Sequence, residues 1–121
     1  MPIRVLIADD ALFMRNMIKD VFASNEFQVV GEAANGVEAV ERYRELRPDI
    51  TTMDIVMPQK SGIEAVREII KQDKSAKIVM CSALGQESLV MEAIEAGAAD
   101  FIVKPFKPEK VLEIVKKVVS L

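Results

Sequence analysis

The chain has 121 residues, of which 50% are hydrophobic and 29% charged, with a formal net charge of −3 and no histidine. A chain of this length forms one domain around a single core, and its acidic balance does not favour a nucleic-acid partner. The missing histidine excludes Ser-His-Asp and Cys-His catalysis, histidine-ligated zinc and a phosphohistidine carrier.

Short apolar or β-branched runs alternate with helix-like segments from one end of the chain to the other. The predicted strands are residues 3–8, 28–33, 49–54, 77–82 and 99–104. Their hydrophobicity is nearly continuous rather than alternating, which is typical of parallel strands that are buried on both faces.

The segments between and after these strands carry apolar residues at helical spacing, and we expect each stripe to face the core. One stripe consists of Phe13, Met14, Met17, Ile18 and Val21, a second of Ile63, Val66, Ile69 and Ile70, and a third of Val90, Ala93, Ile94 and Gly97. The last helix has apolar residues on more than one face, which leaves open both a core helix and a surface for a partner or a second copy.

Residues that favour helix ends flank these segments. Asn35 with Glu38 and Ser61 with Glu64 have the spacing of a capping box. Pro108 suits a first helical position, and Gly97 suits a left-handed helix C-terminus.

Five such strand–helix units predict an α/β fold, with a parallel sheet covered by helices on both faces. No linker, repeat or low-complexity tract interrupts the series, so we expect residues 1–121 to form one domain without an output domain. No apolar run approaches the roughly 20 residues of a membrane span, and the N-terminus does not resemble a signal peptide. The single cysteine, Cys81, permits no internal disulfide, so a cytoplasmic protein without a membrane partner is expected.

Polar residues end four of the five predicted strands: Asp9-Asp10, Asp54, Ser82 and Lys104. In open α/β sheets, ligands bind at the carboxyl ends of the strands. Each residue alone has a structural explanation, with Asp10 as a helix cap, Asp54 as a turn residue and Ser82 as a loop residue. Their combination at one edge predicts a binding site.

The charges of these residues suggest its chemistry. Three neighbouring carboxylates repel one another unless a cation lies between them, and oxygen ligands without His or Cys suit Mg²⁺. A carboxylate beside such a metal can attack phosphorus, while a hydroxyl and a lysine can hold the phosphoryl oxygens. Lys104 then pairs with the acidic cluster at rest and with a phosphoryl group after transfer.

The segments "IADD", "TMDIVMP", "CSA" and "DFIVKPF", in this order and spacing, closely resemble the receiver domain of two-component response regulators. The resemblance covers the whole chain and is strongest to stand-alone chemotaxis members. It implies a flavodoxin-like (βα)5 three-layer sandwich with strand order 2-1-3-4-5.

The resemblance also implies roles for individual residues. Asp54 would accept a phosphoryl group from a histidine kinase. Asp9, Asp10, Asp54 and the backbone carbonyl of Val56 would hold Mg²⁺, for which Mn²⁺ would substitute. The matched switch and phosphate-binding residues are Ser82, Phe101 and Lys104. The matched structural residues are Met57, Pro58, Gly62 and Pro105, the last with a cis peptide bond, and the expected output face includes Met91, Phe101, Lys104 and Val111.

Three positions depart from the family's usual pattern. Phe101 stands where chemotaxis members often carry Tyr, so a phenol hydrogen bond is absent. Val56 is apolar where the side chain often tunes the phosphoryl lifetime. Thr51-Thr52 makes the third strand more polar than the usual aliphatic run.

The resemblance favours a monomeric signalling switch in chemotaxis or flagellar motor control, which catalyses only its own phosphorylation and dephosphorylation. Its expected partners are a chemotaxis-type histidine kinase, a flagellar motor switch protein or another downstream protein, and a phosphatase. A phosphorelay intermediate and a receiver excised from a larger regulator remain alternatives.

Two alternatives come from other classes. A metal-dependent phosphohydrolase would also use an aspartyl phosphate, but it commonly has a second Asp where this chain has Val56. A flavin-binding protein is disfavoured, because two aspartates follow the first strand where a phosphate would need amides and hydroxyls.

Overall fold

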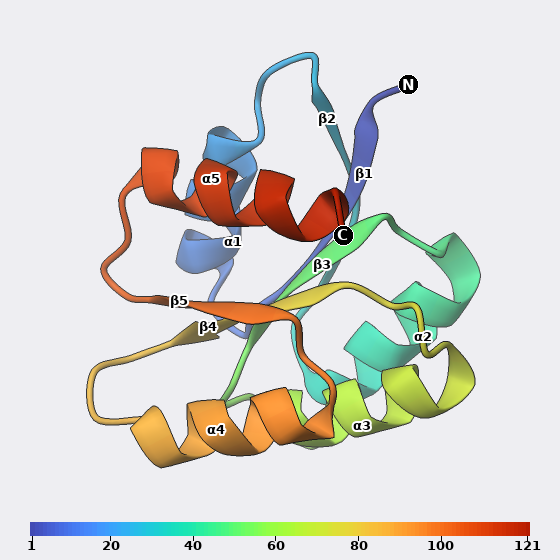
Figure 1. The fold of residues 1–121 in the computed structure, drawn as a ribbon, viewed down its shortest axis with the longest axis vertical. Coiled ribbons are helices and arrows are strands. Elements are labelled where there is room, and N and C mark those ends of the chain that lie inside the picture. The colour runs from blue at the N-terminus through green and yellow to red at the C-terminus, as the bar shows by residue number, and fades with distance from the viewer.

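The computed structural model describes all 121 residues and places a parallel sheet between two layers of helices (Figure 1). Its strands are β1 (Ile3–Ala8), β2 (Phe27–Ala33), β3 (Ile50–Asp54), β4 (Ile78–Ser82) and β5 (Asp100–Val103), in the order β2-β1-β3-β4-β5. Its helices are α1 (Leu12–Val21), α2 (Gly36–Leu46), α3 (Gly62–Gln72), α4 (Glu87–Ala96) and α5 (Pro108–Val119). The predicted flavodoxin-like fold and strand order are confirmed.

The sheet separates two hydrophobic cores. Eighteen buried residues fill the side covered by α2, α3 and α4, and twelve fill the side covered by α1 and α5 (Figure 1). Successive residues of β1 alternate between them, since Val5 and Ile7 belong to the smaller core and Leu6 and Ala8 to the larger. This burial on both faces explains the continuous hydrophobicity of the strand sequences.

The residues predicted to flank the helices lie at the helix ends. The Asn35 side chain accepts a hydrogen bond from the Glu38 amide, and Ser61 and Glu64 form a reciprocal capping box. Pro108 opens α5, and Gly97 follows α4 with a φ of 122°, a positive value that glycine adopts readily.

The apolar stripe predicted for the first helix is only partly buried. Ile18 is buried, whereas Phe13 is 73% exposed and Met17 41% exposed. Helix α1 packs on the smaller core by Ile18 and Val21, whereas Phe13 and Met17, one helical turn apart, lie on the side that faces solvent. The periodicity therefore predicted a wider buried face than the helix has.

No helix of this structure has both the length and the apolarity that crossing a membrane requires.

Candidate functional site

The carboxyl ends of β1 and β3 bring three carboxylates together. One oxygen atom from each of Asp9, Asp10 and Asp54 lies within 4.8 Å of the others. Because β1 and β3 are paired parallel neighbours, their last residues emerge side by side at one edge of the sheet. The side chains of Asp9 and Asp54 are 1% and 13% exposed, whereas Asp10 is open to solvent.

Backbone contacts fix Asp9 and the turn that follows it. Its Oδ1 atom accepts a hydrogen bond from the Ala11 amide at 2.9 Å, and its own amide donates to the Ala33 carbonyl at 3.0 Å. The N-cap of α1 is Ala11, and no side chain caps this helix. Asp10 is therefore not a helix cap, which removes the structural explanation that its sequence position allowed.

A brace behind this turn was not predicted from the sequence. Arg15 donates to the Asp9 carbonyl at 2.8 Å and to Glu32 at 2.9 Å, and Lys19 also donates to Glu32 at 2.9 Å. The hydrogen bond from Lys19 outweighs burial and, with Arg15, lowers the pKa of Glu32. This brace could not be predicted from the spacing of the charges, because Glu32 lies on β2 while Arg15 and Lys19 lie on α1.

Lys104 lies between two of the carboxylates. Its Nζ atom is 3.2 Å from Asp9 Oδ2 and 3.4 Å from Asp54 Oδ2. Burial alone lowers the pKa of Lys104, but the charges of Asp54 and Asp9 outweigh burial and raise it overall. The ammonium therefore stays charged at the sheet edge, and the Lys104–Pro105 peptide bond that follows is cis, as predicted.

The protonation of Asp54 is finely balanced. Burial raises its pKa, Lys104 lowers it, and Asp9 raises it again, so that the pKa reaches about 6. Lys104 alone thus does not neutralise the cluster. A donor set of carboxylate oxygens, without imidazole or thiolate, fits a hard divalent cation that would balance the remaining charge.

The loop after β3 is held by buried neighbours on each side of Val56. Ile55 is 1% and Met57 7% exposed, so that Val56 between them points to solvent with 56% exposure. Gly62 closes the loop, because its amide donates to the Ile55 carbonyl at 2.8 Å and a Cβ there would lie 2.0 Å from the Asp54 carbonyl oxygen. Gly62 therefore admits no side chain, which supports the structural role expected for it.

Ser82 ends β4 and is 1% exposed. Its hydroxyl reaches the Ile102 carbonyl only at 3.5 Å, the limit of a hydrogen bond, so it remains available to a better acceptor. A mainly apolar cavity of about 260 Å³ adjoins it, lined by Ser82, Leu84, Met91 and Phe101 among others. Phe101 lies at this cavity and is 40% exposed.

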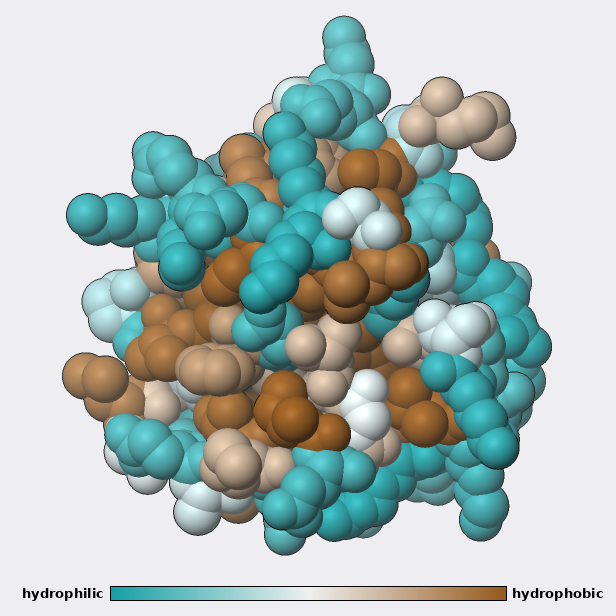
Figure 2. Space-filling model, in the orientation of Figure 1, coloured by the Kyte–Doolittle hydropathy of each residue, from teal (hydrophilic) through white to brown (hydrophobic).

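Hydrophobic side chains gather over the face formed by α4, β5 and α5 (Figure 2). Met91 and Phe101 of the predicted output face are exposed there, together with Val103. Val111 was predicted for this face but is 1% exposed, since it lies on the side of α5 that packs against the sheet. That prediction is wrong.

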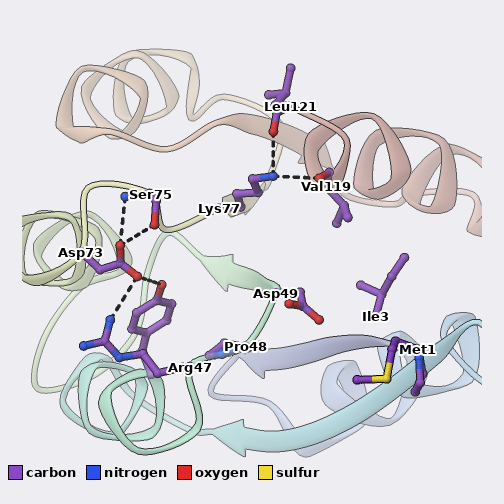
Figure 3. A pocket seen from close by; sticks show the side chains of 12 residues that line it. Met1, Ile3, Arg47, Pro48, Asp49, Asp73, Ser75, Lys77, Val119 and Leu121 are labelled. Atoms are coloured by element: carbon purple, nitrogen blue, oxygen red, sulfur yellow. Dashed lines mark hydrogen bonds and ion pairs between the residues drawn. The ribbon is translucent and has the colours of Figure 1, made fainter.

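A larger cavity, of about 570 Å³, lies away from the carboxylates and is lined by residues of both chain ends (Figure 3). In this cavity Asp73 accepts hydrogen bonds from Tyr43, Arg47 and Ser75. Lys77 donates to the carbonyls of Val119 and Leu121 (Figure 3). The cluster of side chains that could hold a metal lies at Asp9, Asp10 and Asp54 and not in this cavity, so the candidate site remains the acidic edge.

Known proteins resemble this chain over nearly its whole length. It is 60% identical to the chemotaxis protein CheY of Thermotoga maritima over 115 residues, which cover 95% of this chain and 96% of the relative. The solved response regulator domain of Thermotoga maritima CheB has a TM-score of 0.93 and 38% identity, over 100% of this chain and 98% of that one. A solved CheX-CheY-BeF3-Mg²⁺ complex from Borrelia burgdorferi gives a TM-score of 0.92 and 42% identity, over 98% and 90% of the two chains.

The sequence model of the response regulator receiver domain matches residues 5–116, which include every strand end described above. Together with the strand order and the acidic edge, this match establishes the family: the chain belongs to the response regulator receiver domains.

Proposed function

We propose that this chain is a single-domain response regulator of chemotaxis, whose receiver domain spans residues 1–121 and accepts a phosphoryl group on Asp54. The observation that carries the proposal is the position of the Asp54 carboxylate, 3.4 Å from the Lys104 ammonium and next to the Asp9 and Asp10 carboxylates. The 60% identity to a chemotaxis CheY supports the pathway.

Asp9, Asp10, Asp54 and the backbone carbonyl of Val56 would hold Mg²⁺, or Mn²⁺ in its place. The bound cation would neutralise charge on the oxygens of the transferred phosphoryl group. The solved CheX-CheY complex that resembles this chain contains Mg²⁺ and BeF3, which agrees with this assignment.

Asp54 would act as the nucleophile in its ionised form. One carboxylate oxygen forms a bond to phosphorus while the bond between phosphorus and the donor histidine nitrogen breaks, and that nitrogen keeps the bonding electron pair. The Lys104 ammonium, which pairs with Asp54 and Asp9 at rest, would form an ion pair with a phosphoryl oxygen instead. The buried Ser82 hydroxyl, weakly bonded at rest, would donate to another.

These contacts would couple the site to the α4–β5–α5 face. Movement of Ser82 toward the phosphoryl group draws the segment after β4 with it, and Phe101 then turns into the 260 Å³ cavity beside it. The phosphoryl group favours this arrangement because it interacts with Ser82 and Lys104 only there. Exposed Met91 and Phe101 belong to the face that would change.

The proposed partners follow from this switch. A chemotaxis-type histidine kinase donates the phosphoryl group, a flagellar motor switch protein or another downstream protein reads the α4–β5–α5 face, and a phosphatase resets it. Receiver domains like CheY are signalling switches, so we expect the protein to process only its own aspartyl phosphate.

The test is to incubate the protein with acetyl phosphate, with and without Mg²⁺, and to locate any adduct by intact mass and peptide mapping. We expect one hydroxylamine-labile phosphoryl group on Asp54 that requires Mg²⁺ and is absent from the Asp54→Asn variant. Labelling at another residue, or undiminished labelling of the variant, would contradict the assignment. Steady release of phosphate from added phosphomonoesters would instead favour a phosphohydrolase.

A further inference from the structure

The turn between β2 and α2 touches the loop between β3 and α3. The Gly36 amide donates a hydrogen bond to the Lys60 carbonyl at 3.0 Å. A Cβ atom on Gly36 would lie 2.1 Å from that carbonyl oxygen and 2.6 Å from its carbon. Both are backbone atoms, so a side chain at Gly36 would have to displace the Lys60 backbone.

The Gly36 side of this contact is firmly anchored. Asn35 caps the helix by accepting a hydrogen bond from the Glu38 amide, and the Ala34 amide donates to Glu38 Oε1, both at 2.8 Å. Ala39 and Val40 in the next turn pack into the larger core. A steric conflict at Gly36 would therefore move the loop more readily than the helix.

The loop side is constrained in an uncommon conformation. The Lys60 amide donates to the Pro58 carbonyl at 2.7 Å across a three-residue turn, and Gln59 at its centre has a φ of 66°. A positive φ in a residue other than glycine persists only where surrounding contacts enforce it. The Gly36–Lys60 hydrogen bond is one such contact. Lys60 follows Pro58 by two residues, and Val56 precedes Pro58 by two residues in the same loop.

We propose that Gly36 is a positioning residue for the cation site. By holding Lys60 it keeps the β3–α3 loop in the conformation that presents the Val56 carbonyl to a cation bound by the carboxylates. The inference rests on the proposed function, because it requires that Val56 contributes a ligand. Residues that orient the ligands of a metal commonly change its affinity by about 10- to 100-fold when they are replaced.

The first experiment compares Mg²⁺ binding by isothermal titration calorimetry in wild type, Gly36→Ala and Gly31→Ala. We expect Gly36→Ala to raise the Mg²⁺ dissociation constant by about tenfold or more. Gly31→Ala is the matched control, because its Cβ would meet the side-chain ends of Leu46, at 2.6 Å, and Leu6, at 3.5 Å, and not the loop. It should lower stability while leaving Mg²⁺ affinity unchanged.

The outcomes separate this inference from the proposed function. If wild type binds Mg²⁺ and a folded Gly36→Ala variant binds it equally well, the positioning role is wrong while the function stands. If wild type does not bind Mg²⁺, the proposed function fails first. An equal loss of affinity in both glycine variants would show that general destabilisation is the cause, and would also overturn the positioning role.

A second measurement needs no variant. Binding at Val56 and hydrogen bonding at Gly36 stabilise the same loop, so each should strengthen the other by the same free energy. Amide hydrogen exchange in wild type should therefore slow at Gly36 when Mg²⁺ is added, relative to the Glu38 amide on the same helix. Equal exchange rates at Gly36 with and without bound Mg²⁺ would contradict the coupling.

Discussion

Asp54 would have to be ionised to act as the proposed nucleophile, yet burial favours its protonated form. Burial is the largest cause, and the Asp9 and Asp10 charges add to it against the opposing effect of Lys104, so that the pKa rises from 3.8 to about 6. Between these values the folded protein binds more protons than the unfolded chain, so its free energy of unfolding falls as the pH rises through this range.

Asp54→Asn should therefore stabilise the metal-free protein at neutral pH. The shift of about two units corresponds to about 3 kcal/mol, and solvent screening of the partly exposed carboxylate reduces this to about 1–2 kcal/mol. Urea denaturation in EDTA should show the variant more stable than wild type near pH 7, with the difference shrinking near pH 4. An equal difference at both pH values would show that Asp54 does not titrate in this range.

Two buried hydroxyls on β3 lack any hydrogen-bond partner. Thr51 and Thr52 are 0% and 1% exposed, and their Oγ1 atoms are unsatisfied. Valine has almost the same shape without the hydroxyl, and an unsatisfied buried polar group costs about 1–3 kcal/mol. Thr51→Val and Thr52→Val should each raise the free energy of unfolding by about 1 kcal/mol.

Chemical denaturation measures this directly, with the corresponding Thr→Ser variants as controls. Serine keeps the hydroxyl and removes the methyl group, so the Ser variants should be less stable than wild type. A loss of stability on valine substitution would mean that the hydroxyls find a partner, such as a buried water molecule. The result would show how much the two threonine hydroxyls of β3 lower the free energy of unfolding.

At the scale of secondary-structure elements, one cluster ties α2 to the end of α3. Tyr43 donates to Asp73 Oδ2 at 2.7 Å, and Arg47 lies 3.1 Å from the same oxygen (Figure 3). The hydrogen bond from Ser75, followed by that from Tyr43, lowers the pKa of Asp73 to about 2. This tie therefore contributes stability above about pH 4, which is lost as the pH falls toward 2.

Tyr43→Phe removes one hydrogen bond from this tie and keeps the ring in the core. We expect it to lower the free energy of unfolding by about 1 kcal/mol at neutral pH. The difference from wild type should diminish near pH 2, where Asp73 becomes protonated in both proteins. Denaturation curves at the two pH values test this, and a difference independent of pH would assign the effect to packing of the phenol rather than to Asp73.

The positions of the secondary-structure elements could largely be predicted from the sequence. Buried parallel strands are apolar throughout, so their positions could be read to within one or two residues at each end. Strand ends share one edge, so Asp9, Asp54 and Lys104 could be grouped from their positions in the sequence alone. Helical spacing gives a face but not what covers it, and the exposed Phe13 and the buried Val111 are both explained by this ambiguity.

Contacts between separate elements could not be predicted. The brace from Arg15 of α1 to Glu32 of β2 and the close approach of Gly36 to Lys60 join different segments of the chain, through residue types that are common on any surface. A glycine next to a capping residue has many explanations, and only the position of the Lys60 backbone distinguishes among them. The acidic groups were predictable because a cluster of carboxylates at strand ends is unusual. The contacts that hold the neighbouring backbone in place were not predictable.

At the scale of the whole molecule, the two ends of the sheet differ in charge balance. At the end away from the carboxylates, Asp73 is paired with Arg47, and Lys77 is bonded to backbone carbonyls. The carboxyl end has three carboxylates facing one lysine, and one of them, Asp54, has a pKa of about 6. Binding of a cation at that end should therefore stabilise the entire fold, because the charges it relieves are part of the native state.

The stabilisation by Mg²⁺ should depend on pH. A ligand that binds only the folded state raises the free energy of unfolding by about 2.7 kcal/mol when its free concentration is about one hundred times its dissociation constant. Protonation of Asp54 competes with the metal, so acidification through its pKa of about 6 should weaken binding and reduce the gain. Thermal denaturation with Mg²⁺ or EDTA should show a higher midpoint with Mg²⁺ near pH 7.5 and a much smaller gain near pH 5. Asp54→Asn should show little gain at either pH, and an equal gain at both pH values in wild type would place the cation away from Asp54.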